Sequence, residues 1–299
     1  MDRCKVLIPI GCRSDEGLSK PIIKRLKEDD FFNPVHVIRL NPAVFYGSYG
    51  HTEQIIWDIR PDLIFITADR IEMCAAACAA FHNNVPIAHY FAGVLTDPLT
   101  NLDCLNRHCI SLWSDIQLVE STKCWENVLE LFYTVNKKSN CHIIGITHLE
   151  DLEIDISLVP KHSYDLVLYN PPTLYDFQLQ KKDVRELYEI RKSIKNKAII
   201  LDPNPDPKAI FLPVTYPNLP RPQFLGLLKW CSRFITNSSS AIYEAPYFLK
   251  KDQIIMVGDR NKNRTPFMYE KTDKLASEKI VEILKDWWID KHEEIKTTR

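Results

Sequence analysis

The sequence has almost no net charge of either sign. Its 38 lysines and arginines against 39 aspartates and glutamates leave a formal net charge of -1 over 299 residues. Such a balance lacks the basic surface that binds nucleic acid or an anionic membrane. We therefore expect no nucleic-acid partner.

Long apolar runs are also missing. The start, "MDRCKVLIPIGC", has neither the longer apolar core nor the small-residue cleavage site of a secretory signal. No stretch approaches the length that crosses a bilayer. We expect a cytoplasmic protein without a membrane span, and we leave its oligomeric state open, with a homo-oligomer as one option.

Cysteines are present, but none forms a C-x-x-C pair. Their odd number, nine, suggests neither a disulfide framework nor a zinc ribbon. Cys74 and Cys78 share a face of a predicted helix in "CAAACAA", and we interpret them as small packing residues rather than metal or redox groups. We expect no metal and no separate cofactor.

Two common phosphate-binding loops are absent as well. The chain contains no G-x-x-x-x-G-K-[ST] and no G-x-G-x-x-G, which excludes the usual ATP and NAD phosphate loops. It also has no internal repeat and no low-complexity tract.

What the chain does have is a series of apolar, strand-like runs with helical stretches between them. The runs are "KVLIPIG", "VHVIRL", "DLIFITA", "VPIAHYFA", "IQLVES", "CHIIGI", "YDLVLYN", "AIILDPN", "RFITNS" and "QIIMVGD". Continuous hydrophobicity indicates strands covered on both faces, and alternation with helices indicates parallel sheets with right-handed crossovers. The sequence therefore predicts an α/β protein.

The distribution of these runs predicts two domains. Six runs precede residue 150 and four follow residue 160, which fits two doubly wound sheets better than one large sheet. We expect domains at 1–157 and 158–280, and an amphipathic helix at 281–299 that packs back on the first domain.

Two segments allow more than one interpretation. The proline-rich stretch 202–223 is either a stiff loop lining a site at the carboxyl end of a strand or a surface connection made rigid by proline. In "FITNSSSAIYEAP" (234–246), the serines either cap a helix or let an anion approach its first N–H groups. From this stretch alone, capping is the simpler interpretation.

Charged and hydroxyl side chains follow four of the predicted strands, in "GCRSDEGL", "TADRIEM", "TNSSSAIYE" and "GDRNKNR". Each has an ordinary explanation: Asp69 can cap the next helix, and Arg70 can cover a surface. Arginines and serines from both halves, taken together, suit a diphosphate, and Glu244 lies near enough to bind a ribose diol. We predict a nucleotide-diphosphate ligand in a cleft between the domains.

The segments "IGCRSDEGLSKPIIKRL", "PDLIFITADRIEMCAAACAAFHNNVPIAHYFAG", "NRHCISLWSDIQLVES", "YDLVLYNPPTL", "LPRPQFLGLLKWCSRFITNSSSAIYEAP" and "GDRNKNR" also carry a resemblance. The sequence resembles UDP-N-acetylglucosamine 2-epimerases, and among them the hydrolysing branch that feeds sialic and related nonulosonic acids. The resemblance implies a glycosyltransferase-B type fold, with two Rossmann-like domains and the nucleotide held mainly by the second. It also implies an activity: a UDP-sugar such as UDP-N-acetylglucosamine becomes a ManNAc-type sugar plus UDP by elimination and hydration.

The same resemblance implies roles for individual residues. The catalytic candidates are Asp69, Asp103 and His108, with Arg70 and Arg107 beside the sugar. The residues implied for the nucleotide are Ser238, Ser239, Ser240, Arg13 and Arg264 for the diphosphate, Glu244 for the ribose, and the loop around Asn204 and Phe224 for the uracil.

Two departures from the family pattern limit what the resemblance implies. Asn170 stands in "YNPPT" where the family has a histidine, and Val94 stands in "AGV" where it has a glutamate. Valine cannot move a proton, and an amide does not exchange one near neutral pH. The alternatives are therefore a glycosyltransferase of the same fold that uses a UDP-sugar donor, or a catalytically impaired nucleotide-sugar binder.

Overall fold

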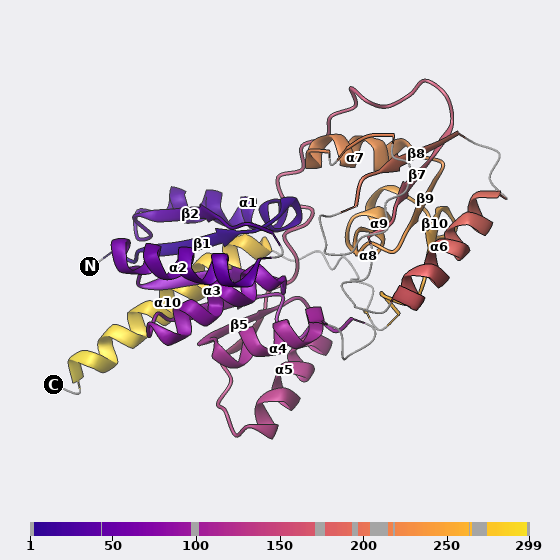
Figure 1. The fold of residues 1–299 in the computed structure, drawn as a ribbon. Helices are drawn as coiled ribbons and strands as arrows, with labels where there is room; N and C mark the ends of the chain where they lie inside the picture. Colours follow the sequence, from indigo (N-terminus) through magenta and orange to yellow (C-terminus); the bar gives the residue numbers. More distant parts are fainter. Residues whose placement is uncertain are drawn as a thin grey trace. The chain divides into compact units, whose positions relative to one another are not determined.

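The computed structural model describes residues 3–42, 44–96, 102–170, 177–192, 197–203, 215–217, 219–262, 264 and 274–297. The chain divides into two compact units (Figure 1). The first comprises Met1–Val94, Asp103–Glu150 and Tyr269–Arg299, and the second comprises Leu95–Leu102 and Asp151–Met268. The chain thus leaves the first unit before the predicted boundary at residue 157 and returns before the predicted tail at 281.

The first unit is built on a six-stranded parallel sheet in the order β2-β1-β3-β4-β5-β6. Its strands are β1 (Val6–Ile10), β2 (Val35–Arg39), β3 (Leu63–Thr67), β4 (Ile87–Tyr90), β5 (Ile116–Val119) and β6 (Cys141–Ile143). Every residue of β1, β3, β4 and β5 is buried, as expected for strands covered by helices on both faces. The prediction of a parallel α/β architecture is confirmed.

The strand order reverses direction within this sheet. After β1 the chain moves outward to β2, and it then crosses back to β3 on the other side of β1. In open α/β sheets, ligands bind outside the carboxyl ends of the strands at such a switch point. The segments that begin at Gly11 and Ala68 leave the sheet there, and both contain predicted site residues.

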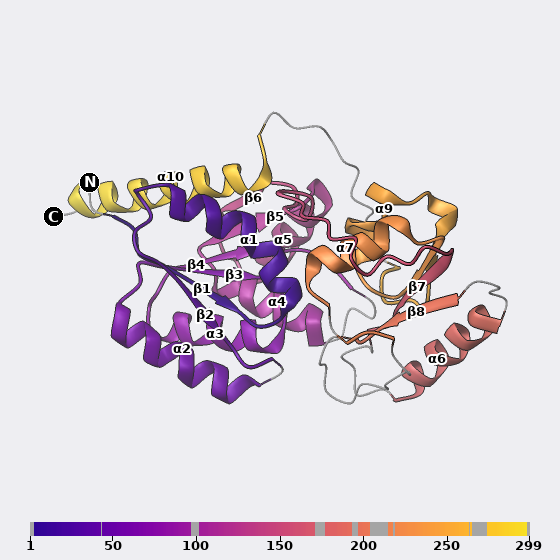
Figure 2. The same cartoon turned by 90° about the horizontal axis from the view of Figure 1, so that it is seen from above.

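Helices cover both faces of the first sheet. They are α1 (Arg13–Glu28), α2 (Phe45–Ile59), α3 (Ile71–His82), α4 (Leu102–Trp113), α5 (Thr122–Thr134) and α10 (Ala276–Thr297). Figure 2 shows α2 and α3 on one face and α1 with α10 on the other.

Contacts with residues near α1 fix the C-terminal helix to this unit. The ammonium of Lys285 lies 3.1 Å from a carboxylate oxygen of Asp29, and Trp288 meets Phe31 edge-on with ring centroids 5.3 Å apart. Near the start of α10, the Ser277 N–H donates to Glu150 at 3.1 Å. The last helix therefore packs on the same body as the first strands.

The second unit contains a four-stranded parallel sheet in the order β10-β9-β7-β8. Its elements are β7 (Tyr164–Leu168), α6 (Phe177–Lys192), β8 (Lys197–Leu201), α7 (Arg221–Trp230), β9 (Arg233–Thr236), α8 (Ser240–Tyr243), α9 (Ala245–Phe248), the 3₁₀ turn η1 (Lys251–Gln253) and β10 (Ile254–Met256). The order reverses between β7 and β9, so a second switch point lies where these two strands end.

One predicted element differs in the structure. The segment after the serines is not a single helix but two one-turn helices, α8 and α9, which meet at Glu244. Pro246 lies in the first turn of α9, where its missing N–H interrupts no helical hydrogen bond. A single turn aligns few peptide dipoles, so the predicted helix dipole behind the serines is weak.

All nine cysteines are free thiols. Within the described ranges, no helix is both long and apolar enough to cross a bilayer.

Candidate functional site

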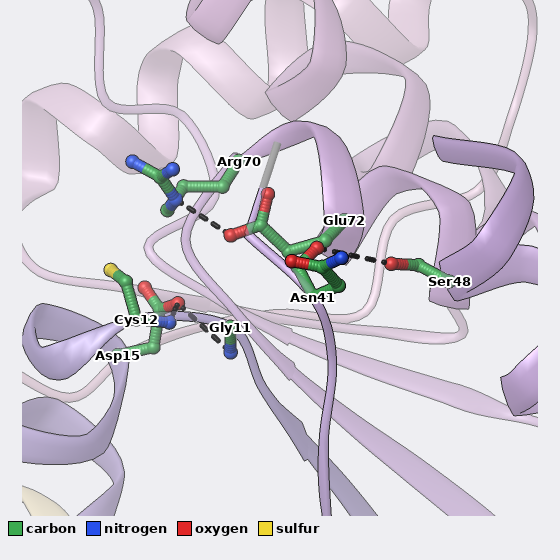
Figure 3. Close-up of polar contacts among 7 residues, drawn as sticks. All are labelled: Gly11, Cys12, Asp15, Asn41, Ser48, Arg70 and Glu72. Atoms are coloured by element: carbon green, nitrogen blue, oxygen red, sulfur yellow. Dashed lines mark hydrogen bonds and ion pairs between the residues drawn. The ribbon is translucent and has the colours of Figure 1, made fainter. Parts of the chain in front are cut away.

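The turn between β1 and α1 is held by a buried carboxylate (Figure 3). One oxygen of Asp15 accepts the N–H of Cys12 at 2.9 Å and that of Gly11 at 3.2 Å. Burial raises the pKa of Asp15 to about 6, although the nearby Arg70 acts in the opposite direction. Arg13 is the first residue of α1, directly after this turn.

A second buried acid faces this turn from α3. Glu72 has no exposed surface, and its Oε1 accepts the Nε–H of Arg70 at 2.7 Å (Figure 3). A Cβ atom on Gly11 would lie 2.3 Å from the same oxygen, so any larger residue there would require Glu72 to shift. The Arg70 side chain is 14% exposed, which favours a structural or site role over the covering of a surface.

Asp69 is held by an arginine from α4. Arg107 donates one guanidinium nitrogen to the Asp69 carboxylate and another to the carbonyl of Val94. Asp69 is 8% exposed and Arg107 is 3% exposed, so this is a buried ion pair. The N-cap position of α3 belongs to Arg70, and the capping explanation for Asp69 is not supported.

Helix α4 carries the two other predicted catalytic residues. Asp103 and Arg107 are four residues apart and therefore share a face of the helix. His108 is half-buried, and both burial and the charge of Arg107 lower its pKa. The imidazole of His108 is therefore neutral at pH 7 and able to accept a proton.

In the second unit, one amide joins the ends of β7 and β9. The Asn237 side chain accepts the backbone N–H of Asn170 at 2.7 Å and donates to its carbonyl at 2.6 Å. Asn261, in the loop after β10, donates to the Asn237 carbonyl at 2.7 Å. Asn237 thus fixes the backbone at this switch point, and Asn170 is 6% exposed.

The three serines of this turn, Ser238, Ser239 and Ser240, differ in their hydrogen bonds. Ser238 Oγ accepts the Ser240 N–H at 3.3 Å and donates to the Ser240 hydroxyl at 3.1 Å, which is a local turn of the capping kind. The N–H and hydroxyl of Ser239 have no partner among the residues that the structure describes, and Ser239 is partly exposed. Ser238 thus makes the local turn, whereas Ser239, at the N-cap position of α8, makes no side-chain cap hydrogen bond.

Glu244 follows these serines by four residues, and Arg264 reaches Tyr243 of the same segment from the loop after β10. Glu244 is 5% exposed, and its Oε1 accepts from Arg221 Nη1 at 2.7 Å. The guanidinium carbon of Arg264 lies 5.9 Å from the ring centroid of Tyr243, and its Nε is buried without a partner in the described part of the chain. A buried, unpaired guanidinium N–H favours an anionic ligand.

Phe224 and Asn204 were predicted to lie beside the uracil, and the structure corrects the prediction for Phe224. Phe224 lies inside α7 rather than in the loop, is 5% exposed, and packs in the core with a ring centroid 6.2 Å from that of Phe234. Its apolar side chain is used by the core, so we leave it out of the nucleotide site. Asn204 lies outside the described residues.

Sequence reasoning missed several polar residues that support these sites, namely the buried Asp15, Glu72, His89, Asn237 and Asn261 and the partly exposed Arg221. Asp15 and Glu72 stand inside motifs already chosen for their arginines, and this adjacency is the only signal the sequence offers for them. Among the described residues, no group of three or more His, Cys, Asp and Glu side chains could hold a metal ion.

Known proteins resemble this chain along most of its length. The sequence model of the family described as UDP-N-acetylglucosamine 2-epimerase matches residues 48–293. The GDP/UDP-N,N'-diacetylbacillosamine 2-epimerase (hydrolyzing) of Campylobacter jejuni is 28% identical over 235 residues, covering 69% of this chain and 59% of that protein. The UDP-N,N'-diacetylbacillosamine 2-epimerase (hydrolyzing) of Legionella pneumophila is 22% identical, covering 87% of this chain and 82% of that protein.

A solved structure shows the same fold. The UDP-GlcNAc 2-epimerase of Neisseria meningitidis, bound to UDP-GlcNAc, superposes with a TM-score of 0.68 at 17% identity, covering 94% of this chain and 100% of that one. The predicted glycosyltransferase-B type fold is thereby confirmed. Because the family match covers residues 48–293, most of the chain, the chain belongs to the UDP-N-acetylglucosamine 2-epimerase family.

Proposed function

We propose that this chain is a hydrolysing 2-epimerase of a UDP-sugar, either UDP-N-acetylglucosamine or a relative such as the diacetylbacillosamine derivative named for two similar proteins. The observation that carries the proposal is the buried Asp69–Arg107 pair beside the switch point of the first sheet. A buried carboxylate held by a guanidinium, at the edge where ligands bind, is positioned to act on a sugar carbon.

The nucleotide half of the proposal rests on the second unit. Ser239 has an N–H and a hydroxyl without a partner among the described residues, and Arg264 has a buried Nε–H; together these groups suit the diphosphate. Glu244 keeps a second carboxylate oxygen beside the one bound to Arg221, and that oxygen is able to accept from a ribose hydroxyl. Arg13 is proposed as a further phosphate ligand, and the predicted cleft between the two halves stays a prediction.

The reaction balances with these groups. A base removes the C2 proton, the C1–O bond breaks, and UDP leaves with the electron pair, so an unsaturated sugar forms. Water then adds its hydroxyl to C1 while a proton returns to the opposite face of C2. We propose Asp69 as the residue acting on the sugar, with Asp103 and His108 of α4 as the other proton carriers. No step requires a separate cofactor.

The departures from the family pattern leave two alternatives to test. Val94 is 3% exposed and its carbonyl accepts from Arg107, so this position supplies no proton carrier. A chain limited in this way would bind the nucleotide sugar without turning it over, or would transfer the sugar to an acceptor.

We also propose a reducing, cytoplasmic setting, which the nine free thiols support.

The test is turnover in heavy water. The protein is incubated with each UDP-sugar while UDP and the free 2-epimeric sugar are measured, together with deuterium at C2. We expect both products and one deuterium at C2, and we expect Asp69→Asn to abolish turnover while UDP affinity changes less than about twofold. Release of UDP only when an acceptor is added would indicate transfer, and protection against melting without turnover would indicate a binder.

A further inference from the structure

Asp69 follows a residue in an unusual backbone conformation. Ala68 has φ +65°, in the left-handed region that residues other than glycine rarely adopt. Two hydrogen bonds hold it there: its N–H donates to the Tyr90 carbonyl at 3.0 Å, and its carbonyl lies 2.8 Å from His89 Nε2. Both partners belong to β4, so the neighbouring strand fixes the turn that presents Asp69.

The chemistry of these partners determines which ring nitrogen of His89 carries the hydrogen. A carbonyl oxygen only accepts, so Nε2 must be the donor to Ala68. His89 is fully buried, and this burial lowers its pKa to about 3, so the ring is neutral. Nδ1 then carries no hydrogen, and the hydroxyl of Ser111, 2.9 Å away, donates to it. Hydrogen bonds run in one direction, from Ser111 through His89 to Ala68.

Helix α4 therefore reaches Asp69 by two routes. Arg107 and Ser111 are four residues apart and share a face of the helix. Arg107 binds the carboxylate of Asp69 directly, and Ser111 acts through His89 on the peptide that precedes Asp69. The same helix thus fixes both the side chain and the backbone of one residue.

We propose that His89 is a positioning residue for Asp69. Its bond to the Ala68 carbonyl keeps the left-handed turn in place and holds the Asp69 carboxylate in line with Arg107, although His89 itself touches no substrate. The inference rests on the proposed function in one respect, since its effect on turnover presupposes that Asp69 acts on the sugar.

Two variants replace His89 with an amide side chain, and they differ only in how far the amide N–H group extends toward the Ala68 carbonyl. In His89→Gln the side-chain N–H group lies close to where Nε2 was, whereas the shorter amide of His89→Asn resembles Nδ1 and cannot reach the Ala68 carbonyl. We expect His89→Asn to lower kcat by about tenfold or more, with KM and the UDP Kd within about twofold, and His89→Gln to stay within about threefold of the wild type.

The matched control is Ser114→Ala. Ser114 directly follows the last residue of α4, and its fully buried hydroxyl donates to the Ile110 carbonyl at 2.6 Å. Ser114→Ala therefore removes a buried hydrogen bond close to the same helix. Among the described residues, no hydrogen bond joins this hydroxyl to the turn at Ala68 and Asp69. We expect this variant to lower Tm but not kcat. Equal kcat values for His89→Asn, His89→Gln and Ser114→Ala would overturn the positioning role.

A spectroscopic readout separates this inference from the proposed function. Nitrogen-15 NMR of the wild type should show His89 neutral with its hydrogen on Nε2, and a hydrogen on Nδ1 instead would refute the inference even if no variant folds. The guanidinium protons of Arg107 should exchange slowly in the wild type, His89→Gln and Ser114→Ala, and rapidly in His89→Asn. If the wild type turns over no UDP-sugar, the proposed function fails while this comparison still decides the role of His89.

Discussion

Arg221 Nη1 lies 2.7 Å from Glu244 Oε1 and links the first residue of α7 to the junction of α8 and α9 in the second unit. The Glu244 side chain is 6% exposed and the Arg221 side chain is 23% exposed, so the carboxylate is desolvated while the arginine stays partly hydrated. A desolvated carboxylate depends on its partner for both its position and its charge.

We therefore expect Arg221→Ala to weaken UDP binding and to lower the free energy of unfolding by about 1–3 kcal/mol, since a buried acceptor loses a charged donor. Calorimetric titration with UDP and urea denaturation measure the two effects. Arg233→Ala is the matched control, because Arg233 makes a forked pair with buried Asp165 (3.1 and 3.0 Å) where β7 and β9 begin. That variant should lose stability but keep its UDP affinity, and equal affinity losses in both would contradict this assignment of Glu244.

Arg264 Nε is buried and has no partner among the described residues, which leads to a second prediction. Arg264→Ala should weaken UDP binding by about 1.5–3 kcal/mol, the loss expected for a charged hydrogen bond, without lowering the free energy of unfolding. Lys262→Ala, which removes an exposed charge from the same loop, serves as the control for a general electrostatic effect. If salt and Lys262→Ala reduce UDP affinity as much as Arg264→Ala does, the arginine makes no specific contact.

The fold was predictable because strands buried on both faces leave continuous apolar runs. All ten runs became strands, and the two groups of runs became two parallel sheets. The break between α8 and α9 was not predicted, because Pro246 is compatible with the first turn of a helix and so does not by itself indicate where one starts.

The site was only partly predictable. Motifs show which polar residues follow a strand, but burial and partners distant in the sequence decide what they do. Asp69 and Arg107 are 38 residues apart, and His89 and Ser111 are 22 apart. The predicted contact of Phe224 with the uracil was wrong because burial again could not be read from the sequence. An aromatic residue near a predicted loop can equally belong to the core, and the structure places Phe224 there.

A third prediction concerns the space beside Gly11. Gly11→Ala should destabilise the protein by about 1–3 kcal/mol, because the new methyl group would clash with the Glu72 carboxylate, one oxygen of which lies 2.3 Å away. Gly50→Ala is the opposite case, since nothing lies within 4 Å of its Cβ position inside α2, and it should stabilise by about 0.5–1 kcal/mol. Urea denaturation of both variants tests the signs, and a neutral Gly11→Ala would show that Glu72 moves aside freely.

The last prediction follows from the raised pKa of Asp15. Its pKa is about 6 in the folded protein against 3.8 ordinarily, so between about pH 4 and 6 the folded state holds a proton that the unfolded chain has released. The stability contributed by this proton is complete below pH 4 and is lost as the pH rises to 6. At about 1.4 kcal/mol per pH unit, the change approaches 3 kcal/mol.

Asp15→Asn keeps an oxygen to accept from Gly11 and Cys12 but cannot titrate. Its free energy of unfolding, relative to the wild type, should therefore rise between pH 4 and 6, as urea denaturation at several pH values can show. His89→Gln should change in the opposite direction, because the pKa of His89 falls from 6.5 to about 3 and its stabilising effect is lost as the pH decreases. A pH-independent difference for Asp15→Asn would mean that the carboxylate is ionised in the folded protein and that its two N–H donors and Arg70 outweigh its burial.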